Sequence, residues 1–145
     1  MLDIHSILRW LVAVFLLLVV FRSIAGVAGK KPFTKADNLL AILLLSFTHI
    51  QFLMGLALYY MMGWAAAFHN MGASMKDSTT RFWSMEHAVL MVLAIVLITM
   101  GRVKSKKAAD DLAKHKKGMI FYSLALLLIL WAAIVKPFLL GRGWL

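Results

Sequence analysis

The chain has 145 residues, of which 63% are hydrophobic and only 15% are charged, with a formal net charge of +10. A soluble domain is about half apolar and about a quarter charged, so this composition indicates a membrane protein, with a single domain over residues 1–145. The absence of cysteine excludes disulfides, thiolate metal sites and cysteine nucleophiles. In a membrane chain, basic loops retained in the cytoplasm explain the positive charge better than nucleic-acid binding does.

Four apolar stretches cover residues 4–27, 38–62, 78–101 and 118–140. Each has about 22 to 25 residues, which as an α-helix spans roughly 33 to 38 Å and crosses a hydrocarbon core of about 30 Å with some tilt. Because the backbone must satisfy its own hydrogen bonds in lipid, these stretches are predicted to be helices. The short connections predict an all-α, up-down-up-down four-helix membrane bundle.

The ends of the helices carry recognisable signals. Glycine and proline within residues 26–32 end the first helix, and Asp37 is expected to cap the second. Asp77 or Ser78 is expected to cap the third helix. The longer, semi-apolar segment 63–76 is expected to lie along the membrane interface.

Eleven of the sixteen Lys and Arg residues flank the first and third connections, which lie on the same side of the membrane. They are Arg22, Lys30, Lys31, Lys35, Arg102, Lys104, Lys106, Lys107, Lys114, Lys116 and Lys117. The positive-inside rule places this side in the cytoplasm and both termini in the periplasm of a bacterial inner membrane. The aromatic residues near the opposite interface are expected to form a belt: Trp10, Tyr59, Tyr60, Trp64, Trp83 and Trp144.

His49 is the first candidate for a functional residue. It lies near the middle of the second helix, where an ionisable side chain is costly in lipid and indicates function by default. The alternative is a neutral histidine that bonds to a neighbouring helix.

His87 is the second candidate and lies roughly 13 Å below the outer end of the third helix, against roughly 20 Å for His49. A small shift of the helix ends brings the two to one level. Two imidazoles that face each other across a bundle make a haem b site, because neutral imidazole is the common axial ligand. The alternative is an interfacial His87 paired with Glu86.

His5 is the third candidate, at the outer end of the first helix, with Arg9 one turn later. It could replace His49 as the partner of His87. It could also bond a haem propionate, with Arg9 and Arg81 supplying positive charge. The alternative is an interfacial helix start with a snorkelling arginine.

Other chemistry finds less support. His115 lies in a lysine run and is interpreted as part of a cytoplasmic topology determinant. No glycine-rich phosphate loop and no nucleophile elbow occurs in the sequence. A metal site would need four side chains at one depth, which the predicted depths do not favour: His5, His49, His87 and Glu86.

The motifs around these candidates occur in a fixed order: residues 5–10 (HSILRW), 31–33 (KPF), 48–51 (THIQ) with Gly55, 75–78 (MKDS), 81–83 (RFW), 86–87 (EH) and 114–116 (KHK). In these motifs, and over almost its whole length, the chain resembles a family of small four-helix membrane proteins of Bacteroidetes-type bacteria labelled cytochrome b or cytochrome b-like. The resemblance implies a b-type haem and electron transfer. It identifies no axial ligands.

We therefore expect a b-type cytochrome of the inner membrane, which fits an electron carrier or subunit better than a stand-alone enzyme. His49 and His87 are the first pair expected to ligate the haem iron, with His5 next. The electron partner would be a quinone or a larger respiratory membrane complex, and an oligomer is left open. The rivals are a haem-free accessory or structural subunit and a metal- or proton-handling protein that uses the outer His/Glu cluster.

The orientation can be tested with reporter fusions. A reporter active only in the periplasm should work when it follows Leu145, because the basic loops hold the opposite side in the cytoplasm. A reporter active only in the cytoplasm should work when inserted between Lys104 and Lys117. Reversed activities would contradict the argument from the basic loops.

Overall fold

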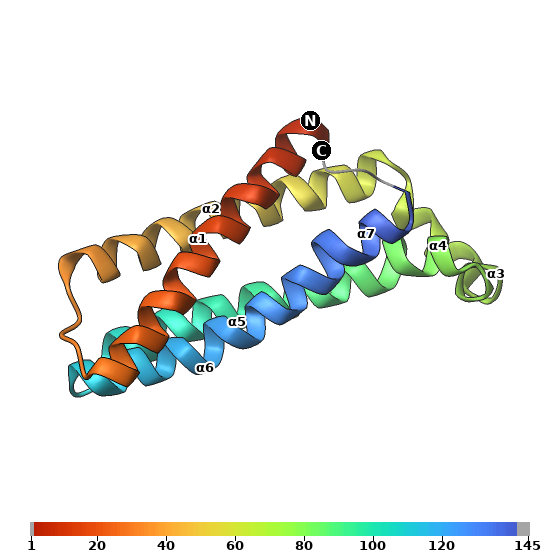
Figure 1. Cartoon of the computed structure of the whole chain (residues 1–145). Coiled ribbons are helices and arrows are strands. Elements are labelled where there is room, and N and C mark those ends of the chain that lie inside the picture. The colour runs from red at the N-terminus through yellow and green to blue at the C-terminus, as the bar shows by residue number, and fades with distance from the viewer. Residues whose placement is uncertain (1, 142–145) are drawn as a thin grey trace.

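The structure is a computed structural model and describes residues 2–141. Within this range, four helices are long and apolar enough to cross a membrane: Asp3–Gly29, Lys35–Met61, Ser78–Lys107 and Asp111–Leu139. Consecutive spans run in opposite directions, with the two basic connections together at one end of the bundle (Figure 1). The predicted all-α four-helix bundle is confirmed.

The elements follow the chain with few irregular residues between them. They are α1 (Leu2–Gly29), α2 (Lys35–Met61), η1 (Trp64–Asn70), α3 (Met71–Lys76), α4 (Ser78–Arg81), η2 (Phe82–Glu86), α5 (His87–Lys107), α6 (Asp111–Ile129), η3 (Leu130–Val135) and α7 (Lys136–Leu139). Two of them, η2 and η3, are π-helical turns inside the third and fourth spans. Such turns widen a helix locally and are frequent at functional sites.

The four long helices form a closed ring of neighbours. α1 packs against α2 and α6, and α5 packs against the same two helices. α1 and α5 therefore occupy diagonal corners of the bundle. The core between them is filled by buried side chains such as Leu16, Leu44, Ile98 and Ala125.

The third connection is much shorter than expected. The sequence analysis ended one apolar stretch at residue 101 and began the next at residue 118, but α5 continues to Lys107 and α6 begins at Asp111. Lysine and arginine mark where the chain leaves the hydrocarbon core of the membrane. Because both are good helix formers, the helices continue past that point. Asp110 starts α6 by accepting a hydrogen bond from the backbone N–H of Ala113 at 2.8 Å.

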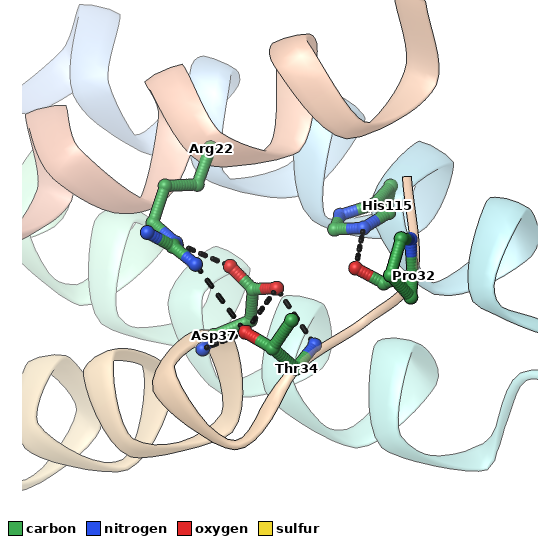
Figure 2. A network of polar contacts seen from close by, with 5 residues as sticks. All are labelled: Arg22, Pro32, Thr34, Asp37 and His115. Atoms are coloured by element: carbon green, nitrogen blue, oxygen red, sulfur yellow. Dashed lines mark hydrogen bonds and ion pairs between the residues drawn. The ribbon is translucent and has the colours of Figure 1, made fainter. Parts of the chain in front are cut away.

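The cap of α2 also differs from the expectation. Thr34, and not Asp37, is the N-cap, and Asp37 completes a capping box by accepting the backbone N–H of Thr34 at 2.8 Å. Arg22 of α1 forms an ion pair with Asp37 and also donates to the Thr34 hydroxyl (Figure 2). The end of α1 is thereby tied to the start of α2 by charge-assisted hydrogen bonds.

At the opposite end, Asp77 caps α4, as expected. Its carboxylate accepts hydrogen bonds from the hydroxyl of Thr80 and from the backbone N–H of Thr80. These bonds stabilise the ionised form and lower the pKa of Asp77 below its ordinary value. Of the expected aromatic belt, Trp64 and Trp83 stack with ring centroids 6.4 Å apart. Trp144 lies outside the described residues.

His115, which the sequence analysis interpreted as part of a cytoplasmic topology determinant, is a buried residue. Only 2% of its surface is exposed, and its Nε2 donates to the carbonyl of Pro32 at 3.3 Å (Figure 2). A Cβ atom on Gly26 would clash with several atoms of the His115 ring. α1 and α6 can therefore approach closely here only because residue 26 is glycine.

Two glycines in the last turn of α1 give a matched test of this contact. Gly26→Ala should destabilise the folded protein by about 1–3 kcal/mol, because the His115 ring is enclosed and has no room to move. Gly29→Ala should be neutral or stabilising by up to about 1 kcal/mol, because its new methyl meets only the flexible side chain of Lys31 at 3.2 Å. Thermal unfolding in detergent measures both, and equal melting temperatures would contradict the close contact.

Candidate functional site

A cavity of about 460 Å³ lies at the end of the bundle where α1 begins and α2 ends. All four long helices contribute to its walls, which are mostly apolar. Its polar lining includes His5, Arg9, Thr48, Gln51, Tyr59, Tyr60 and His87. Both its size and this mixture of apolar walls with a few polar groups are typical of cofactor and small-molecule sites.

Helical periodicity directs two of the three candidate histidines towards this cavity. On α1, His5 is followed at steps of four and three residues by Arg9 and Val12, which are buried. On α5, His87 is followed in the same way by Met91 and Ala94. Positions with this spacing share one face of a helix, so His5 and His87 lie on the inner faces of the diagonal helices.

His87 is fixed by a hydrogen bond to the backbone of the fourth span. Its Nδ1 lies 2.8 Å from the carbonyl oxygen of Ala132, in η3. A carbonyl can only accept, so Nδ1 carries the proton and Nε2 of a neutral ring carries the lone pair. The rings of Trp83 and Phe82 pack around the imidazole, with centroids 5.1 and 5.6 Å from that of His87.

His5 lies against α2, beside Gln51. The Gln51 amide nitrogen donates to the His5 carbonyl at 2.8 Å and lies 3.4 Å from His5 Nε2. Because an amide nitrogen only donates, His5 Nε2 accepts in this longer contact, so the lone pair of the ring lies on Nε2. Gly55 lies one turn further along α2, where an added Cβ would be in ordinary contact with the His5 ring at 3.4 Å.

His49 does not line the cavity. It is exposed on the outer surface of α2, and its Nδ1 donates to the carbonyl of Leu45, one turn earlier, at 2.8 Å. The neighbouring Thr48 is the residue that α2 turns inward. The structure therefore does not bring the expected pair His49 and His87 together; it brings His5 and His87 to one cavity.

Of the two candidate arginines, only one lines the cavity. Arg9 lines the cavity, is 6% exposed, and lies with its guanidinium carbon 5.2 Å from the centroid of the Trp10 ring. Arg81 does not line the cavity. Its Nε donates to Glu86 at 2.9 Å and its Nη1 to the carbonyl of Met75 at 3.1 Å.

The four-residue metal site weighed from the sequence is not assembled in the part of the chain that the structure describes. Across residues 2–141, no group of three or more His, Cys, Asp or Glu side chains could hold a metal ion. Glu86 is engaged by Arg81, and His49 lies outside the cavity. The chemistry of the cavity is therefore that of two imidazoles and one buried guanidinium.

Sequence reasoning missed several residues of this site. Thr48 and Gln51 sit beside His49 and could have been found from the spacing of α2, because they share a face with Gly55. The hydroxyl of Tyr59 donates to the carbonyl of Ser84 at 2.6 Å. The carbonyls of Ser84 and Ala132 give no signal in the sequence, because any residue type supplies the same group.

Two histidines on diagonal helices, one buried arginine and apolar walls make up the geometry of this site. Its chemistry must be judged from those residues. Comparison with family models, with curated proteins and with solved structures finds no match for this chain.

Proposed function

We propose that this protein is a b-type cytochrome that binds haem in the cavity and transfers electrons within the bacterial inner membrane. The observation that carries the proposal is that His5 and His87, from diagonal helices, line one cavity of about 460 Å³. Histidines on opposite corners of a bundle can bind both faces of a flat ring that stands between them. His5 and His87 would be the axial ligands, in place of the pair His49 and His87.

The hydrogen bonding of His87 fits the role of a ligand. A histidine that ligates a metal usually donates its other ring nitrogen to a carbonyl or carboxylate, which fixes the tautomer and raises the basicity of the ligating nitrogen. The bond from Nδ1 of His87 to the Ala132 carbonyl is of this kind. Nε2 then carries the lone pair that a metal ligand needs, on a ring whose orientation is set by the protein.

The remaining lining residues fit an anionic, largely apolar group. Arg9 supplies a buried positive charge in the cavity, which would balance a propionate. The mostly apolar walls give the cavity an interior of low polarity, in which ligation and charge act more strongly than in water. When bound, haem b supplies the one-electron redox chemistry, and the protein tunes it through ligation, burial and charge.

The resemblance of the sequence motifs to small membrane proteins labelled cytochrome b agrees with the same proposal. In the proposed arrangement the basic loops are cytoplasmic and both termini are periplasmic, so the cavity lies near the periplasmic side. Lipid surrounds the bundle. The electron partner is a quinone or a larger respiratory complex.

The second candidate is a haem-free accessory subunit, in which the histidines only join helices. The contacts of His87 Nδ1 with the Ala132 carbonyl and of His5 Nε2 with the Gln51 amide favour this alternative, because each imidazole connects two helices. The visible spectrum of the purified protein, reduced minus oxidised, separates the two. A b-type α-band with haem supplied during expression supports the cytochrome, and its absence supports the accessory subunit.

Single histidine substitutions test the ligands. His5→Ala and His87→Ala should each abolish the low-spin, bis-histidine spectrum, because each removes one axial donor. His49→Ala is the matched control and should retain that spectrum, because His49 faces outward from α2. Loss of the spectrum in His49→Ala with retention in His5→Ala would restore the pair His49 and His87, and normal haem in all three variants would contradict ligation by these histidines.

The two arginines give a second test. Arg9→Gln should lower the midpoint potential of the haem, because loss of a nearby positive charge destabilises the reduced and more negative form. Arg81→Gln should leave the potential nearly unchanged, because Arg81 pairs with Glu86 away from the cavity. Redox titration measures the midpoint potential of both variants. Equal shifts would contradict the assignment of Arg9, and not Arg81, to the haem cavity.

A further inference from the structure

The carbonyl of Ala132 lacks the backbone N–H donor that a regular helix would supply. In an α-helix it would accept from the backbone N–H of Lys136, four residues later. Because η3 is π-helical, Lys136 donates instead to the carbonyl of Trp131, five residues earlier. In the same π-helical register the donor to Ala132 would be residue 137, which is Pro137 and has no N–H.

A carbonyl left in this way inside a membrane bundle is costly unless a side chain satisfies it. His87 supplies the donor, from Nδ1 at 2.8 Å, although it lies 45 residues earlier in the sequence. Pro137 is itself among the fully buried side chains, and His87 is the first residue of α5. The start of α5 is thus joined to the last part of the fourth span by one hydrogen bond at the cavity wall.

We propose that Pro137 is a positioning residue for His87. By withholding an N–H from the carbonyl of Ala132, it keeps that carbonyl available to Nδ1 of His87 and so holds the lone pair of the imidazole on Nε2. This effect on the tautomer is independent of any bound group. Its consequence for redox potential rests on the proposed function, since it requires that His87 ligate a haem.

The variant Pro137→Ala restores the missing donor. The new N–H of residue 137 competes with His87 for the Ala132 carbonyl, so the imidazole loses its fixed partner. In haem-free protein labelled with ¹⁵N-histidine, wild-type His87 should show a single tautomer with the proton on Nδ1. Pro137→Ala should shift His87 to a mixture of tautomers, and the resonance is assigned by its loss in His87→Gln.

Pro32→Ala is the matched control, because Pro32 is the only other proline of the chain and lies in the α1–α2 connection at the opposite end. The His87 resonances should be unchanged in this variant. The inference is overturned if wild-type His87 carries its proton on Nε2, a result that needs no folded variant. It is also overturned if Pro137→Ala folds and keeps the wild-type tautomer.

The loaded protein gives a readout that separates this inference from the proposed function. If His87 ligates haem, loss of the Nδ1 hydrogen bond makes Nε2 a weaker donor to the ferric ion, so the midpoint potential of Pro137→Ala should rise. A shifted tautomer in a protein that never binds haem would support the positioning role and refute the cytochrome. A bis-histidine haem with an unchanged tautomer and potential in Pro137→Ala would refute the positioning role alone.

Discussion

In the apolar interior of a bilayer the peptide backbone has no water to bond, so every carbonyl that leaves the regular helical pattern must find a donor elsewhere. Most of this bundle obeys that constraint by remaining helical, and the two π-helical turns are where the pattern changes. In η2 the carbonyl of Ser84 accepts from the hydroxyl of Tyr59, and in η3 the carbonyl of Ala132 accepts from His87. Both donors line the same cavity. Two of the polar side chains that line the cavity therefore also satisfy carbonyls of the irregular backbone.

The fold was predictable because long apolar stretches in lipid have few structural solutions. The four spans and their alternation are confirmed, with Asp77 capping α4. Hydropathy reports where the chain leaves the hydrocarbon, however, and not where the helix ends. The predicted boundaries at residues 101 and 118 therefore missed the basic turns that extend α5 and α6. The packing role of His115 gave no signal for the same reason, because a lysine run does not reveal that one of its faces is covered by α1 and the α1–α2 connection.

The site was only partly predictable, because depth in the membrane was weighed without the direction of each side chain. Adjacent residues on a helix point about 100° apart, and this one step separates the inward-facing Thr48 from the outward-facing His49. His5 was ranked below His49 on depth, yet its spacing to Arg9 turns it to the inner face. The hydrogen-bond acceptor of His87 could not be predicted from the sequence, because it is the backbone carbonyl of Ala132 in a π-helical turn. Such a turn adds a residue and rotates everything after it relative to the expected pattern.

The diagonal arrangement of α1 and α5 has a consequence for how the protein is maintained in the cell. These helices pack on α2 and α6, and both present imidazoles to the space between them. A group that joined the two imidazoles would link α1 directly to α5, two helices that are held together mainly through α2 and α6. Binding of this group would stabilise the folded bundle, and the stabilisation would increase with the logarithm of the free concentration of the group. Under the proposed function, the amount of intact protein in the membrane would follow the supply of cofactor, and unloaded chains would be the first removed by proteolysis.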